Sequence, residues 1–155
     1  MSFRVYIGHS VAPHELGAIY AMAELAAGKG MEPIIPDRRW PPDEPPARIQ
    51  QFLKGLDAFV TVATLGGEYI AWVTSELSTA LALGMNPQKI VSVVDQGVQV
   101  PEVGHVVIID RSNFDVTISK TVEILEQLQM DRTQRNLLAG LVLGGLMALL
   151  LASRE

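Results

Sequence analysis

The run at residues 56–64 constrains the fold of this chain more than any other stretch. It reads LDAFVTVAT and lacks the alternation of apolar and polar residues that a strand with one solvated face would show. A strand of this kind is usually covered on both faces, as in a parallel sheet with helices on either side. The run therefore predicts an α/β domain.

Strand and helix patterns alternate along the rest of the chain. Strands are predicted at residues 3–8, 32–36, 56–64, 89–94 and 105–110, and helices at 13–30, 47–55, 66–84 and 116–128. Between the second strand and the second helix, residues 37–46 read DRRWPPDEPP, with four prolines and five charges, which predicts an exposed loop. Right-handed crossovers between parallel strands would place ligands at the carboxyl ends of the strands.

Composition excludes several classes of function. The 155 residues suffice for one domain, and the net charge of -5, without a run of Lys or Arg, gives no support for a nucleic-acid-binding face. The absence of cysteine excludes disulfides, thiolate metal sites and cysteine nucleophiles. The three histidines have no metal-ligand spacing, so no metal site is expected.

Trp72 and Glu76 are the most prominent candidate site residues. They lie four residues apart on the predicted helix 66–84 and so share a face close to the end of the preceding strand. An apolar stripe of Val73, Leu77, Ala80 and Leu81 would face the core, with Glu76 half-buried at its edge. Spacing alone favours a solvated Glu76, as glutamates on helices usually are, and a Trp72 that belongs to the core and does not line a pocket.

The chain resembles the Toll/interleukin-1 receptor (TIR) domains over roughly residues 3–128. The similarity lies in RVYIGHS at residues 4–10, in the loop 37–46 that precedes DAFVTVAT, and above all in AWVTSELSTALALG followed by KIVSVVD. This resemblance implies a flavodoxin-like five-stranded parallel sheet with helices on both faces. A domain at residues 1–130 would be followed by a short linker at 131–136 and a C-terminal hydrophobic helix at 137–153.

The resemblance also implies an activity, because in enzymatic TIR domains the matching glutamate is the catalytic residue of NAD+ cleavage. Glu76 would then be catalytic, NAD+ would be the substrate, and no separate cofactor would be needed. The substrate-binding residues implied are Trp72, Gly8, His9, Ser10, Asp37, Arg39, Trp40 and Thr64. The loop 37–46 looks like the family's BB loop and would mediate homo-oligomer assembly, although its charged residues also fit a merely solvated loop.

The tail predicts a membrane anchor. Residues 137–152, LLAGLVLGGLMALLLA, contain no polar side chain and would span about 24 Å as a helix, near the ~30 Å of a hydrocarbon core. Arg132 and Arg135 precede them, which predicts a single C-terminal span with the domain in the cytoplasm. A stripe of small residues, Gly140, Gly144 and Ala148, predicts self-association. A buried helix in a soluble assembly is the alternative.

Three functions remain open from the sequence. The first is a membrane-tethered NAD+-consuming TIR enzyme that self-association activates. The second is a non-catalytic TIR scaffold that signals by assembly. The third is an enzyme of the nucleoside deoxyribosyltransferase type, which also uses a carboxylate on a similar sheet.

Overall fold

A sheet of five parallel strands organises the computed structural model, in the order β2-β1-β3-β4-β5. The strands are β1 (Phe3–Ser10), β2 (Met31–Ile34), β3 (Ala58–Ala63), β4 (Ile90–Val94) and β5 (His105–Ile108). The structure describes residues 2–36, 50, 51, 53–98 and 103–152, with side chains only as far as Leu138. This strand order is that of the flavodoxin-like form of a doubly wound sheet, so the predicted α/β class is confirmed.

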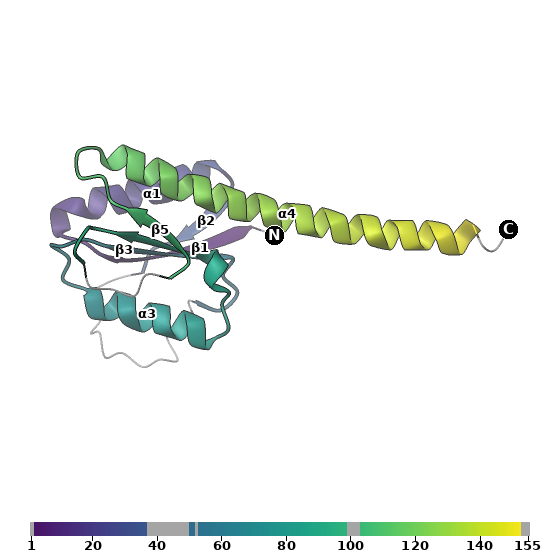
Figure 1. Cartoon of the computed structure of the whole chain (residues 1–155), viewed down its shortest axis with the longest axis horizontal. Helices are drawn as coiled ribbons and strands as arrows, with labels where there is room; N and C mark the ends of the chain where they lie inside the picture. The colour runs from purple at the N-terminus through teal and green to yellow at the C-terminus, as the bar shows by residue number, and fades with distance from the viewer. Residues whose placement is uncertain (1, 37–49, 52, 99–102, 153–155) are drawn as a thin grey trace.

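Helices cover both faces of the sheet (Figure 1). Helix α1 (Leu16–Gly28) and the first part of α4 (Phe114–Ala152) lie on one face, and α3 (Ile70–Ala82) lies on the other. Two short 3-10 turns, η1 (Pro13–Glu15) and η2 (Pro87–Lys89), precede α1 and β4. Residues 50, 51 and 53, in the predicted helix 47–55, are also helical.

The central strand β3 explains the unbroken apolar run in the sequence. It lies between β1 and β4, and all six of its residues are buried. Successive side chains point to opposite faces of a sheet. Val60 and Val62 accordingly pack with α1 and α4, and Phe59 packs on the α3 side. Each such side chain contributes about 1.5–3 kcal/mol by its burial.

Strand β5 is covered on one face only. Val107 is buried beneath α4, whereas Val106 and Ile108, on the other face, are 43% and 53% exposed. The described residues between β4 and β5, 95–98 and 103–104, contain no helix that could cover them. The α3 layer therefore does not extend over the edge of the sheet.

Helix α4 runs without a break from the domain into the tail. Its first turns pack on the sheet, and its last turns project well beyond the domain (Figure 1). Residues 131–136, for which the sequence predicts a linker, are part of this helix. Leu137 and Leu138, the last residues with described side chains, are 63% and 60% exposed. Among the residues that the structure describes, no helix is long and apolar enough to cross a membrane.

Candidate functional site

The carboxylate of Glu76 lies inside the protein, between α3 and β1. Glu76 is 1% exposed, and its Oε2 accepts a hydrogen bond from the Tyr6 hydroxyl. The Tyr6 ring stacks on Phe59, with 5.4 Å between ring centroids, so packing on the sheet fixes the hydroxyl. The expectation that Glu76 is half-buried is wrong, because α3 turns Glu76 into the sheet and leaves Leu81 at the edge, 37% exposed.

Gly8 makes room for this carboxylate. It follows Tyr6 by two residues on β1 and therefore points to the same face of the sheet. A Cβ added at Gly8 would lie 3.0 Å from Glu76 Oε1, closer than side chains normally approach. By the same alternation, Ser10 and Thr61 also point toward α3. The sheet face beside Glu76 thus carries only small residues toward the carboxyl ends of β1 and β3.

Trp72 lies one helical turn before Glu76 and is also buried, at 5% exposure. Both residues belong to the buried side of α3, together with Val73, Leu77 and Ala80. The predicted proximity of Trp72 and Glu76 is therefore realised, on the side of the helix that faces the sheet.

The loop between β3 and α3 is packed tightly against the end of β1. A Cβ at Gly67 would lie 2.1 Å from the Ser10 carbonyl oxygen and 2.4 Å from its Oγ, so only glycine fits there. The Tyr69 backbone N–H donates to Ser10 Oγ at 3.0 Å, and the Thr64 N–H donates to the Ser10 carbonyl at 2.9 Å. Ser10 thus positions the start of α3, the helix that carries Glu76.

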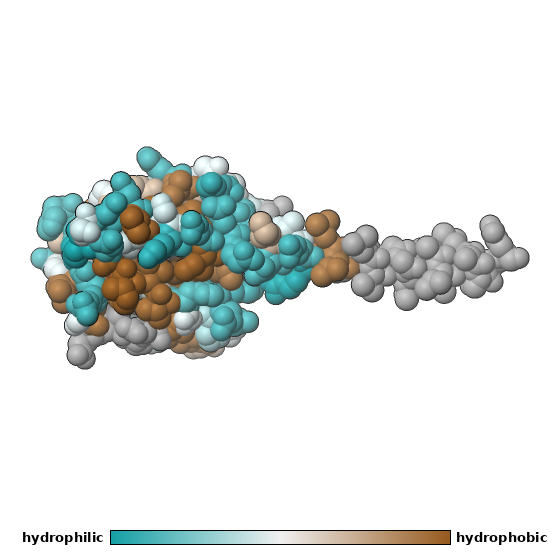
Figure 2. Space-filling model, turned by 45° about the horizontal axis from the view of Figure 1, so that its top comes forward, coloured by the Kyte–Doolittle hydropathy of each residue, from teal (hydrophilic) through white to brown (hydrophobic). Residues whose placement is uncertain are grey.

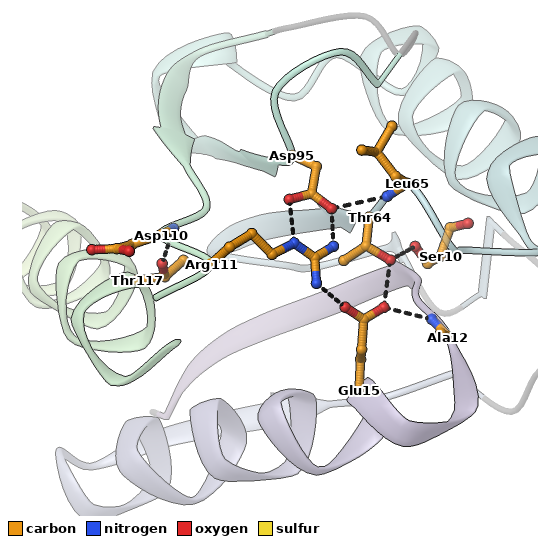
Figure 3. Close-up of polar contacts among 9 residues, drawn as sticks. All are labelled: Ser10, Ala12, Glu15, Thr64, Leu65, Asp95, Asp110, Arg111 and Thr117. Atoms are coloured by element: carbon orange, nitrogen blue, oxygen red, sulfur yellow. Dashed lines mark hydrogen bonds and ion pairs between the residues drawn. The ribbon is translucent and has the colours of Figure 1, made fainter. Parts of the chain in front are cut away.

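A second polar cluster joins the carboxyl ends of the strands on the α1 side (Figure 3). The Arg111 guanidinium, after β5, donates to both carboxylate oxygens of Asp95, after β4, and to Glu15 Oε2 in η1. Glu15 Oε1 also accepts from the Ala12 N–H at 2.9 Å and from Thr64 Oγ1 at 2.8 Å. We call Glu15, Asp95 and Arg111 the rim cluster.

Both carboxylates of the rim cluster are buried and well partnered. Burial opposes ionisation of Glu15, but hydrogen bonds from Ala12, Thr64 and Arg111 outweigh it and lower its pKa. Burial likewise opposes ionisation of Asp95, and Arg111 and the Leu65 N–H lower the pKa of this carboxyl. The rim cluster is therefore charged near neutral pH. Its hydrogen bonds hold η1 and the segments after β3, β4 and β5 in place relative to one another.

The predicted binding residues fall into three groups. Gly8, Ser10 and Trp72 lie on the same side of the sheet as Glu76. Thr64 instead binds Glu15 in the rim cluster, and His9 points to the opposite face of β1, where its Nδ1 lies 3.3 Å from the Ile7 carbonyl oxygen. Three further predicted residues, Asp37, Arg39 and Trp40, lie outside the described residues, as does the whole loop 37–46.

Sequence reasoning missed Tyr6, Glu15 and Arg111. Tyr6 had a detectable signal, because the alternation in VYIGHS puts it on the same strand face as Gly8. Glu15 and Arg111 had none, because they are 96 residues apart and only the fold brings them together.

Comparison with protein-family models gives no match for the chain, and comparison with curated proteins gives none either. Among the described residues, no group of three or more His, Asp or Glu side chains could hold a metal ion. The geometry around Glu76 is therefore the main guide to the chemistry.

Proposed function

We propose that the protein is a TIR-like enzyme that cleaves the bond between nicotinamide and ribose in NAD+, with Glu76 as its catalytic carboxylate. The observation that carries the proposal is the position of this carboxylate. It is buried, held by the Tyr6 hydroxyl and directed at the bare backbone of Gly8. We infer NAD+ as the substrate from the resemblance of residues 4–10 and 71–84 to TIR domains.

The expected reaction breaks the C1′–N bond between ribose and nicotinamide. Nicotinamide leaves as a neutral base with the bonding electron pair, while positive charge develops on the ribose. Water attacks C1′, a proton is released, and the products are ADP-ribose and nicotinamide; attack by an adenine nitrogen instead gives a cyclic product. A fixed carboxylate beside the developing charge is typically worth about 3 kcal/mol, or roughly two powers of ten in rate.

The burial of Glu76 adds a requirement for access. At 1% exposure, the carboxylate is closed to a substrate unless part of the surrounding chain moves. We therefore expect the isolated chain to be nearly inactive and self-association to open the site.

The test follows nicotinamide release from NAD+ by the full chain clustered on vesicles. We expect Glu76→Gln, which preserves the shape of the side chain, to lower the rate at least about 100-fold. Glu68→Gln is the matched control, since Glu68 is an exposed glutamate just before the same helix, and its rate should be unchanged. Equal rates for the wild type and Glu76→Gln would overturn the proposal.

Transfer of a deoxyribosyl group is the second candidate function. The observation in its favour is that Glu76 is buried and held by the Tyr6 hydroxyl, as a carboxylate nucleophile that forms a covalent sugar intermediate would be. Incubation with a deoxynucleoside and a different free base would then yield exchanged product, with a deoxyribosyl adduct on Glu76 detectable by mass spectrometry. A scaffold without activity would show neither exchange nor nicotinamide release when clustered.

We also propose that residues 137–152 tether the domain to a membrane as a single C-terminal span, with the domain cytoplasmic. The support is the run of sixteen residues without a polar side chain, preceded by Arg132 and Arg135. Release of the protein from membranes by alkaline carbonate would overturn this tether.

A further inference from the structure

Helix α4 leaves the domain at the amino-terminal end of the strands, opposite the rim cluster (Figure 1). Arg132 lies where α4 leaves the domain. Its guanidinium is 2.9 Å from Asp57 Oδ2 and 3.3 Å from the Ser2 carbonyl oxygen. The guanidinium also lies over the Phe3 ring. Asp57 in turn accepts from the Arg4 N–H at 2.8 Å, which ties this point to β1. The exit of α4 is thus fixed to the start of the sheet.

Little chain separates this fixed point from the apolar tail. Residue 137, the first of the apolar run, follows Arg132 by five residues of continuous helix, a rise of about 7–8 Å. That distance is about one Debye length at physiological salt, ~8 Å. If the tail enters a bilayer, charges on this end of the domain lie within range of the lipid headgroups.

The described cations gather at this same end. Those beside the starts of the strands or the exit of α4 are Arg4, Lys29, Lys54, Lys89, Arg132 and Arg135, and only Arg111 and Lys120 lie elsewhere in the described chain. The opposite end carries Glu15, Glu68, Asp95, Asp110 and Asp115. The end with the starts of the strands also carries four carboxylates, Glu32, Asp57, Glu126 and Asp131, and two of them pair with Lys29 and Arg132. Its six cations still outnumber these carboxylates, whereas carboxylates are in excess at the opposite end. The domain is therefore polarised, even though its net charge is negative.

A cavity opens between the starts of β3 and β4 and the end of α3. Its volume is about 580 Å³, and Lys54 and Lys89 are the two charged residues in its lining, beside Gln50 and Asn86. The cavity combines cations with amide side chains, a set of groups that suits a phosphate-bearing headgroup. We call this end of the domain, from Lys54 and Lys89 to Arg132, the basic end. Figure 2 shows that the surface where α4 leaves the domain is mostly hydrophilic.

We propose that the basic end docks on an anionic phospholipid surface, which holds Glu76 and the rim cluster away from the membrane. The inference rests on the proposed tether. Strand β1 alone is about 26 Å long, so the rim would stand some 30 Å or more from the headgroups, whereas the basic end would stand within about 10 Å. The candidate site would then open to the aqueous phase.

The test uses the full chain in vesicles of phosphatidylcholine, with or without phosphatidylserine. Because the chain has no cysteine, a dye can be attached singly at Gln88→Cys on the basic end or at Ser112→Cys on the rim, both exposed. A headgroup-bound acceptor should quench the dye at residue 88 at least about threefold more than the dye at residue 112, given the ~10 Å and ~30 Å distances.

Charge reversal separates electrostatic docking from the tether itself. Phosphatidylserine should increase the quenching at residue 88, and Lys54→Glu with Lys89→Glu should remove that increase. Lys120→Glu, on the part of α4 that lies away from the basic end, should leave the increase intact. Equal quenching at residues 88 and 112 in protein that floats with the vesicles would overturn the docking and leave the tether standing. Protein that does not float at all would overturn the tether instead.

Discussion

The hydroxyl of Tyr6 and the carboxylate of Glu76 form a hydrogen-bonded pair that joins strand β1 to helix α3 across the core. The two residues are 70 positions apart in the chain, and both are at most 2% exposed. Carboxylates in such surroundings need donors, because a buried charge without hydrogen bonds is costly. The pair therefore links the stability of the fold to the geometry of the candidate site.

Removing the hydroxyl in Tyr6→Phe should destabilise the protein. The buried carboxylate loses a donor while the aromatic packing on Phe59 is kept, so the free energy of unfolding should fall by about 1–3 kcal/mol. Chemical denaturation would measure this. Tyr20→Phe is the control, since Tyr20 is 56% exposed, and it should change little. Equal stability of the two variants would show that the Tyr6 hydroxyl contributes nothing.

Adding a methyl group in Gly8→Ala should displace the Glu76 carboxylate, because the new Cβ would lie 3.0 Å from Oε1. We expect a loss of about 1–3 kcal/mol in stability from overpacking, together with reduced nicotinamide release. Gly17→Ala is the control: its Cβ would meet nothing within 4 Å on α1, and the variant should gain about 0.5–1 kcal/mol. Full activity of Gly8→Ala would indicate that Glu76 tolerates displacement.

Replacing the guanidinium in Arg111→Met should leave Glu15 and Asp95 without their shared cation. Breaking a fully buried ion pair costs about 3–5 kcal/mol, but the Arg111 side chain is 47% exposed, so water can partly replace it. We therefore expect a loss of about 2 kcal/mol, measured by thermal or chemical unfolding. Lys120→Met, an exposed cation on α4, should stay within about 0.5 kcal/mol of the wild type.

Acid should destabilise the protein through the same cluster. The pKa values of Glu15 and Asp95 are lowered in the folded state, so the unfolded chain binds protons more readily. Their contribution is complete above the unfolded pKa values of about 4 and is lost as pH falls through the folded values. The free energy of unfolding should thus be steady from about pH 5 to 7 and fall below about pH 4.

The rim cluster can be separated from other acidic groups in that pH series. In the double variant Glu15→Gln and Asp95→Asn, the decline below about pH 4 should be shallower than in the wild type, because two of the groups that take up protons are gone. An identical slope in both proteins would assign the acid sensitivity to other carboxylates.

Much of the fold was predictable because its signals are local. The buried run at residues 56–64 became β3, and the predicted strand at 89–94 became β4 with a difference of one residue. The predicted helix 13–30 instead begins with the 3-10 turn η1, in which Glu15 accepts hydrogen bonds from the Ala12 N–H and the Thr64 hydroxyl. The linker expected at residues 131–136 is helical, with no Gly or Pro there to interrupt α4.

By itself, the sequence determined the class of fold, because hydrophobic runs and helical spacing are read from neighbouring residues. Glu76 became a candidate through the resemblance of residues 71–84 to TIR domains. Only the tertiary structure decided that Glu76 is buried against Tyr6, that Thr64 and Arg111 belong to a second cluster, and that α4 leaves from the basic end. Such contacts depend on how far a helix rotates on its sheet and on which strand ends meet. They join residues 49 to 96 positions apart, and no local pattern in the chain encodes them.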